Sequence, residues 1–320
     1  MDKNFIWPEN KIRLQRFLNL KFYIPKTYRI EEKLQEMFPS GSAVLCSSGR
    51  AAINIALESL NQKRPDMIGT NTYTSHCVLD AISRIATPIK WDSLNKDIKT
   101  RLIYHQWGYV QKESIDIDTI DDCVDSLCEL GTELFPTSKN FEIWSLPKIL
   151  GTSSGAVLWC KDPKVAENIR IFRNKRGGGI FCWILRIIGF FSTNFYWLWQ
   201  GIEPQKGKLS IMELLEINNA IKQWDRIVKD RKTKLDLLWQ FAPKWIDKPS
   251  LRLPCVIPLE FVKYTKIKEF RNLKIEIKHF EKKLKNQEIN LIKVLPLPIH
   301  QDVSLNSLIA IKNELMNLNN

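Results

Sequence analysis

One lysine stands in surroundings that could change its chemistry. Lys148 follows the sequence WSLP and precedes the uncharged run ILGTSSG. Burial among apolar neighbours lowers the pKa of an amine, and the neutral amine is the form that attacks an aldehyde to make a Schiff base. The alternative is a surface lysine whose stem lies on apolar neighbours while its charge stays in water.

Carboxylates form a second group, where a short apolar alternation ends in the sequence IDDCVD at 120–125. A carboxylate can keep a ring nitrogen of an organic cofactor protonated, so that the ring accepts electrons from a breaking bond. The candidates for this task are the three carboxylates of the run, Asp121, Asp122 and Asp125. The alternative is an acidic turn in contact with water.

A turn of small residues, Ser47 to Gly49, precedes a predicted helix that begins near Arg50. The first backbone N–H groups of a helix have no partner within it, and the helix dipole adds positive potential there. Such a turn can bind a phosphate group. The alternative is a turn that only caps its helix.

These candidates fall at the ends of predicted strands and helices. Apolar residues at helical spacing follow a β-rich run and a turn within 42–60. Further segments alternate in character: strands at 67–69, 87–91, 101–105 and 155–160, and helices at 75–85, 163–174 and 211–240. Alternation of this kind predicts an α/β protein with a mostly parallel sheet flanked by helices.

Taken in order, the motifs resemble the DegT/DnrJ/StrS family of nucleotide-sugar aminotransferases, from about residue 37 to the C-terminus. SSGRAAINIAL is similar to the family's S-S-G-T-A-A-L helix start, and TNTYTSHCVLDAI to its T-[YW]-V-A-T segment. DDCVDSL stands where the family has E-D-A-A-[HQ]-A, and SLPKILGTSSGAVL resembles S-F-H-x-x-K-x-[IL]-x-x-G-E-G-G-A-[VL]. The resemblance implies the type I aminotransferase fold, which depends on pyridoxal 5'-phosphate (PLP), in a shortened and divergent member.

The resemblance gives roles to residues around the cofactor ring. Lys148 takes the place of the lysine that forms the Schiff base, where dehydratases of the family carry His. Asp122 becomes the partner of the pyridine nitrogen, and Tyr73 the aromatic residue stacked on the ring. Asp125 departs from the family, because Gln or His usually stands there near the ring oxygen, and it adds a negative charge.

The resemblance also implies a phosphate site at Ser48, Gly49 and the backbone N–H of Arg50, with Ser145 as a further contact. Arg50 replaces the family's Thr, so only its backbone carries over. Lys206 replaces the Asn expected to reach the phosphate of a neighbouring subunit, and it could act there as a point charge.

Three histidines are candidates for the substrate pocket. His76 and His105 lie close in sequence to the cofactor motifs, and His300 lies in PLPIHQDVSLN, which is similar to the family's closing L-P-[IL]-[HY]-x-x-L-S segment. The alternative for each is a hydrogen-bonded structural His. No metal site is expected, because the seven cysteines show no C-x-x-C pair.

The function implied by the resemblance is transfer of an amino group, with glutamate as the expected donor, to a nucleotide-linked keto-sugar in surface polysaccharide or amino-sugar biosynthesis. Two alternatives stay open. One is a degenerate member that binds PLP or a nucleotide sugar as a regulator or scaffold. The other is a PLP-dependent, dehydratase-like enzyme.

The expected organisation is a large PLP-binding domain at 1–205 and a small α+β domain at 206–320. The resemblance also implies a homodimer with a shared active site. The aromatic-rich segment 180–202 is expected to be a buried dimer or domain contact, and the alternative is a peripheral membrane contact. The net charge is +13 but the basic residues are scattered, so no nucleic-acid partner is expected. The charged N-terminal residues lack the apolar region of a signal peptide, which favours the cytoplasm.

Overall fold

The computed structural model describes residues 6–9, 25–92, 94–111, 116–137, 140–189, 191–260, 270, 273, 275–283 and 289–319. Within the aromatic-rich segment, Phe190 lies outside the described residues.

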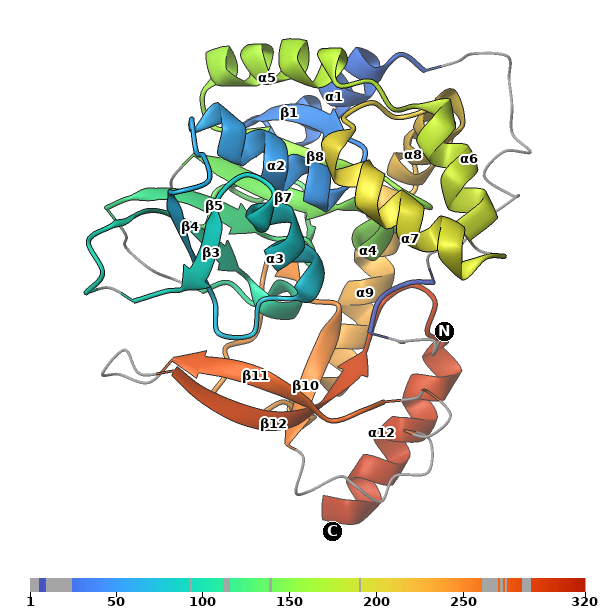
Figure 1. The fold of residues 1–320 in the computed structure, drawn as a ribbon. Helices are drawn as coiled ribbons and strands as arrows, with labels where there is room; N and C mark the ends of the chain where they lie inside the picture. Colours follow the sequence, from blue (N-terminus) through green and yellow to red (C-terminus); the bar gives the residue numbers. More distant parts are fainter. Residues whose placement is uncertain are drawn as a thin grey trace.

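A seven-stranded sheet in the order β1-β8-β7-β5-β4-β2-β3 forms the centre of the molecule (Figure 1). Its strands are β1 (Ser42–Cys46), β2 (Met67–Thr70), β3 (Thr87–Lys90), β4 (Ile98–Tyr104), β5 (Asp118–Asp122), β7 (Phe141–Ser145) and β8 (Ala156–Cys160). Neighbouring strands are parallel except where β8 pairs antiparallel with β1 and β7. The predicted α/β class with a mostly parallel sheet is confirmed.

Alternating side chains of the strands pack into two separate hydrophobic cores, one on each face of the sheet. In β1, Val44 and Cys46 face one cluster while Ala43 and Leu45 face the other, as the period of two in a strand requires. The first cluster is covered by α2 (Gly49–Ser59), α3 (His76–Ser83) and α5 (Pro163–Lys175). The second is covered by α1 (Thr27–Met37), α4 (Leu146–Leu150), α8 (Ile211–Ile221) and α9 (Trp224–Leu238). Both faces of the sheet are therefore buried.

A second, three-stranded sheet lies below the large one in Figure 1. Its strands are β10 (Val256–Glu260), β11 (Lys278–Lys283) and β12 (Ile289–Pro298), with β12 central and antiparallel to both neighbours, and α12 (Leu305–Asn319) follows. The short strands β6 (Leu127–Cys128) and β9 (Arg252–Leu253) pair with each other. The expected α+β character of this part agrees with these elements, and a boundary at residue 205 stays a prediction.

The helix expected over 211–240 is two helices, so that prediction was wrong. Gln223 adopts φ −100° and ψ 8° between α8 and α9, and Trp224 then turns into the core, where its Nε1 donates to the carbonyl of Cys128 at 2.8 Å. Neither Gly nor Pro marks this break. The aromatic-rich segment forms α6 (Ile180–Gly189) and α7 (Thr193–Ile202), which pack on each other. Among the described residues, no helix is long and apolar enough to cross a membrane.

Candidate active site

The candidate residues meet at the carboxyl ends of the parallel strands, where ligands bind in open α/β sheets. Strand β5 ends at Asp122, opposite Tyr104 of β4 and Ile143 of β7. Strand β7 runs directly into α4, whose third residue is Lys148. Pro147 lies in the first turn of α4, a position where proline is favoured because its missing N–H would have no partner there. Gly151 ends α4 in the left-handed region at φ 66°. These two signals make α4 a short helix that turns Lys148 back over the edge of the sheet.

The nearest polar partner of Lys148 is Asp125. The Lys148 Nζ lies 3.2 Å from Asp125 Oδ1, and the Asp125 side chain is fully buried. The same oxygen accepts a hydrogen bond from Trp7 Nε1 at 2.6 Å, and Oδ2 accepts one from the Tyr104 hydroxyl at 2.5 Å. Asp125 therefore accepts from three groups that come from distant parts of the chain.

The amine of Lys148 holds its proton more tightly than a free lysine. Burial lowers its pKa, but the carboxylates of Asp125 and Asp122 outweigh burial, so that the pKa is raised. The expectation of a lowered pKa was wrong. The sequence indicated apolar neighbours along the chain correctly, whereas the two carboxylates come from the end of β5 and from the turn that follows it.

Asp122 is a buried carboxylate whose side chain accepts only a weak hydrogen bond from the described residues. Its Oδ1 accepts from the backbone N–H of Val124 at the long distance of 3.4 Å. Burial raises its pKa to about 6, the charge of Lys148 opposes this, and the charge of Asp125 adds to it. A buried carboxylate of this kind is stabilised by a cationic N–H group. Asp122 therefore fits a protonated pyridine nitrogen, the group that PLP would bring.

The turn before α2 keeps the donors that a phosphate requires. Ser48 is the N-cap, and its Oγ accepts from the N–H of Ala51 at 3.1 Å, which leaves the N–H groups of Gly49 and Arg50 for an anion. A Cβ placed on Gly49 would make an ordinary van der Waals contact with Val124 at 3.8 Å, so the backbone of this turn is not crowded by neighbouring side chains. Ser145 is half-buried at the N-cap of α4 and makes no side-chain cap bond. The residues present fit a phosphorylated cofactor.

The side chain of Arg50 is directed to the segment after α7. Its Nη2 lies 2.8 Å from Glu203 Oε2 and its Nη1 donates to the carbonyl of Gln200 at 2.9 Å. Ser47 bonds the other oxygen of Glu203 at 3.1 Å and the carbonyl of Lys206 at 2.9 Å. A buried carboxylate thus lies beside the turn, with Arg50 balancing its charge.

Tyr73 contacts the second sheet, and its role as the aromatic residue stacked on the cofactor ring stays a prediction. Its ring stacks on His279 of β11 at 5.4 Å with an interplanar angle of 13°, and its N–H donates to Glu281 Oε1 at 2.9 Å. The aromatic ring next to Lys148 is that of Trp7, 4.3 Å from Nζ to the ring centroid. Sequence reasoning missed Trp7, and no periodic pattern or motif marks it.

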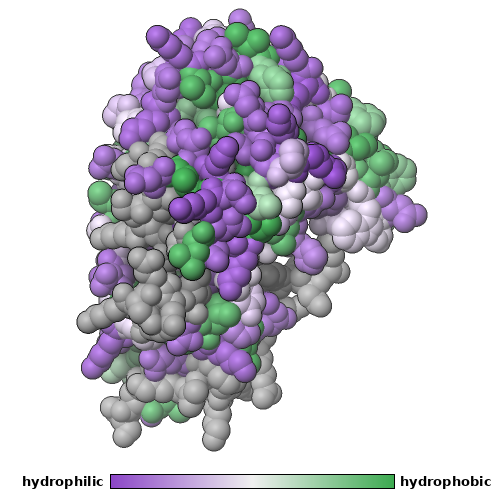
Figure 2. All heavy atoms as spheres, turned by 60° about the vertical axis from the view of Figure 1, so that its left-hand side comes forward, coloured by the Kyte–Doolittle hydropathy of each residue, from purple (hydrophilic) through white to green (hydrophobic). Residues whose placement is uncertain are grey.

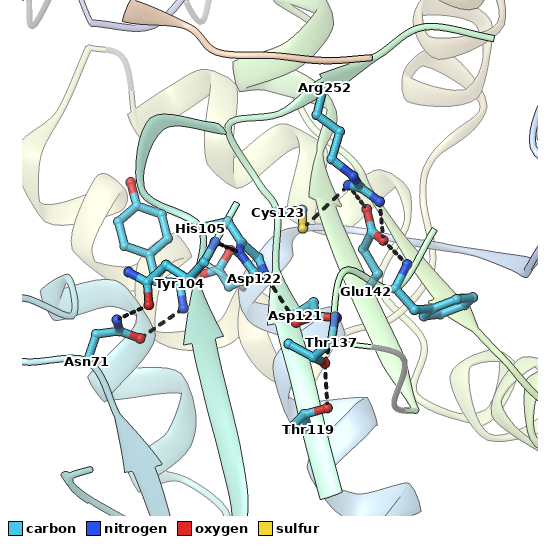
Figure 3. A network of polar contacts seen from close by, with 12 residues as sticks. Asn71, Tyr104, His105, Thr119, Asp121, Asp122, Cys123, Thr137, Glu142 and Arg252 are labelled. Carbon is cyan, nitrogen blue, oxygen red and sulfur yellow. Dashed lines mark hydrogen bonds and ion pairs between the residues drawn. The ribbon is translucent and has the colours of Figure 1, made fainter. Parts of the chain in front are cut away.

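The histidine candidates lie in three different settings. His105 is fully buried, its Nε2 lies 3.0 Å from Asp121 Oδ1, and its Nδ1 accepts from the N–H of Gln111 at 3.0 Å, so both nitrogens are engaged within the chain (Figure 3). His76 is exposed at the start of α3. His300 is fully buried, and its Nδ1 accepts from the N–H of Asp302 at 3.3 Å.

Two other features bear on ligands. In the part of the chain that the structure describes, no group of three or more His, Cys, Asp or Glu is placed to hold a metal ion. A surface cavity lies at the opposite, amino-terminal end of β7, lined by Asn140, Phe141 and Lys161 among others, and Lys148 is not part of its lining.

Comparison with known proteins also indicates a PLP-dependent enzyme. A family described as "Putative PLP-dependent aminotransferase" matches residues 30–318. Similar solved structures include Spr1654 from Streptococcus pneumoniae, called a "putative sugar aminotransferase" (13% identity, 98% of this chain and 96% of that chain, TM-score 0.67). The same fold is found in DesV from S. venezuelae, at 15% identity over 95% of this chain and 92% of that chain, with a TM-score of 0.64. It is also found in a DegT DnrJ EryC1 StrS aminotransferase from Brucella abortus, at 11% identity over 92% of this chain and 91% of that chain, with a TM-score of 0.61. No curated protein matches the sequence. Because the family match spans nearly the whole chain, the protein belongs to a family of PLP-dependent aminotransferases.

Proposed function

We propose that the protein transfers an amino group from glutamate to a nucleotide-linked keto-sugar, with Lys148 as the residue that bonds PLP. The observation that carries this proposal is the pairing of Lys148 with Asp125 next to the buried carboxylate of Asp122, at the carboxyl edge of the sheet. A sugar substrate is favoured by the name of one fold neighbour, Spr1654, which is called a sugar aminotransferase.

PLP, when bound, supplies an aldehyde for a lysine amine and a ring that withdraws electrons from the donor's α-carbon. Lys148 has to lose its proton before it can bond the aldehyde, and the free amine later moves a proton at the reacting carbon as general base and acid. Asp122 holds the proton on the ring nitrogen. The N–H groups of Gly49 and Arg50, with Ser48 and Ser145, hold the phosphate.

The substrate side of the proposal rests on charge and position. A net charge of +13 suits a substrate with a nucleoside diphosphate. His76 and His300 remain proposed contacts of the sugar, whereas both ring nitrogens of His105 already bond Asp121 and Gln111. The product, an amino sugar, would feed surface polysaccharide or amino-sugar biosynthesis in the cytoplasm.

A homodimer through α6 and α7 is part of the proposal. Most of the face in Figure 2 is hydrophilic, with hydrophobic side chains gathered at its right-hand edge. On α6, α7 and the turn between them, large hydrophobic side chains are exposed, among them Ile180, Phe181, Ile184, Phe191, Trp197 and Leu198. A second copy of the chain would bury them, as large aromatic side chains are buried at protein interfaces. A peripheral membrane contact is the competing use of the same surface.

The test is an absorption spectrum of the purified protein with PLP, before and after glutamate. A band of lysine-bound cofactor that glutamate converts to the amine form supports the proposal, and Lys148→Ala should lose the band. Product analysis with a panel of nucleotide-linked keto-sugars then tests the acceptor. A protein that binds PLP without glutamate-driven conversion would contradict the aminotransferase role of these residues, and release of a dehydrated sugar would indicate the dehydratase-like alternative.

A further inference from the structure

The segment 6–9 reaches the active site from the N-terminal part of the chain. Ile6 is 7% exposed and packs in a cluster with Val256 and Phe280 of the second sheet. The N–H of Glu9 donates to Asp302 Oδ2 at 2.8 Å, close to the start of α12, where Figure 1 draws the segment in dark blue. Trp7, between these two anchors, is therefore held on both sides.

The indole of Trp7 contacts both charged groups of the lysine pair. Its Nε1 donates to Asp125 Oδ1 at 2.6 Å, the same oxygen that lies 3.2 Å from Lys148 Nζ. Its ring centroid lies 4.3 Å from that Nζ, within the range of a cation–π contact. One side chain thus binds the carboxylate through its N–H and faces the ammonium with its ring.

These two contacts act on the lysine in different ways. The N–H donates to Asp125 and so reduces the negative potential that Asp125 presents to Lys148. The ring excludes water from one side of the amine and stabilises its charge. Because the segment is anchored on the second sheet and α12, the amine is positioned by a part of the chain outside the seven-stranded sheet.

Other ionisable groups among the described residues act on this pair. Those acting on Lys148 are Asp125, Asp122, Cys77 and Cys255, and those around Asp125 are Asp122, Tyr104, Arg231 and Cys255. Trp7 has no charge of its own, so its replacement by Phe changes one hydrogen bond and leaves this set of charges intact.

We propose that Trp7 is a positioning residue of the active site, which acts through Asp125 and its ring face to fix where the Lys148 nitrogen lies and how tightly that nitrogen holds its proton. This proposal rests on the proposed role of Lys148 as the residue that bonds PLP. It adds a residue from the N-terminal segment to the site.

The test compares Trp7→Phe with Asp125→Asn and with the matched control Trp91→Phe, whose half-buried ring lies over Arg101 just after the edge strand β3. The absorbance of the lysine-bound cofactor is titrated with pH in each protein. In Trp7→Phe, Asp125 loses a donor and attracts the proton more strongly, so the midpoint should rise by about half a pH unit. In Asp125→Asn the negative charge is removed, so the midpoint should fall by about one unit or more. The control should titrate as the wild type does.

An unchanged midpoint in Trp7→Phe, or a shift in the same direction as Asp125→Asn, would overturn the role of Trp7. A change in thermal unfolding alone would also overturn it, because that is the result of a merely structural indole. Failure of the proposed function looks different: without a role for Lys148 the wild type would show no band of lysine-bound cofactor, and without aminotransferase activity the band would be present but glutamate would not convert it.

Discussion

Replacing Arg252 by methionine should destabilise the fold beside the active site. The two terminal nitrogens of Arg252 lie 2.6 and 3.0 Å from the two oxygens of Glu142, whose side chain is fully buried (Figure 3). Glu142 also accepts from Trp144 Nε1 at 2.6 Å and from the N–H of Phe135 at 2.5 Å. The variant leaves a buried carboxylate with two neutral donors and no cation.

Removal of one partner from a buried ion pair costs about 3–5 kcal/mol. Because two donors remain on Glu142, we expect the lower end, a loss of about 3 kcal/mol in the free energy of unfolding at pH 8. Burial alone would raise the pKa of Glu142, but Arg252 together with the hydrogen bonds from Trp144 and Phe135 outweighs burial and holds that pKa below its usual value. In the wild type, the stability from this pair is present above the pKa of a free Glu and is lost as the pH falls through the lowered pKa.

In Arg252→Met the shift of the Glu142 pKa reverses its direction. Burial without the cation raises the pKa of Glu142, so lowering the pH protonates the carboxyl and relieves the penalty. The deficit relative to wild type should therefore shrink between pH 8 and pH 5, as measured by urea unfolding with tryptophan fluorescence. Arg29→Met is the matched control, because Arg29 pairs with Glu32 on the surface of α1, where both side chains are exposed, and exposed pairs contribute less than about 1 kcal/mol. A loss below about 1 kcal/mol at pH 8, or a deficit independent of pH, would refute this reasoning.

Further changes test the cofactor and subunit contacts. Asp122→Asn should keep the fold but slow the glutamate-driven conversion of bound PLP about 100-fold or more, because the ring nitrogen loses its anionic partner. Stopped-flow absorbance measures this rate, and a rate near that of the wild type would count against Asp122 as the partner of the ring nitrogen. Arg50→Met should leave Glu203 uncompensated beside the phosphate turn and raise the Kd for PLP about 10-fold in spectral titration; an unchanged Kd would mean that Glu203 does not act on the phosphate. Phe191→Asp with Trp197→Asp should turn a dimer into monomers by light scattering, whereas an unchanged mass with lost vesicle binding would favour the membrane contact.

The meeting of Lys148 with the acidic cluster was predictable from local signals. Alternation of strands and helices predicts parallel strands, and parallel strands bring their carboxyl ends to one edge of the sheet. Asp122 is the last residue of one such strand and Lys148 follows the end of another, so their proximity is expected without knowledge of side-chain packing. The capping role of Ser48 is of the same local kind.

Contacts between distant segments were not predictable in this way. Trp7 and Asp125 are 118 positions apart, and no spacing rule connects them. The stack of Tyr73 on His279 depends on how the second sheet lies against the loop after β2, and Arg50 turns to Glu203 because α7 and η3 (Glu203–Gln205) end beside α2. The sequence indicates residue types, whereas tertiary packing decides which of two aromatic residues stands by the lysine.

The carboxylate at position 125 shows how such packing accommodates a departure from the family pattern. A negative charge where the family has Gln or His would repel an electron-rich ring oxygen if it were left unbalanced. Here the charge of Asp125 is stabilised by three donors, which are the Tyr104 hydroxyl, the Trp7 indole and the Lys148 ammonium. When Lys148 bonds the cofactor, the first two donors remain on Asp125 and still moderate its charge. A carboxylate can therefore stand at this position because Tyr104 and Trp7 stand beside it, and we expect Asp125 to be tolerated only together with them.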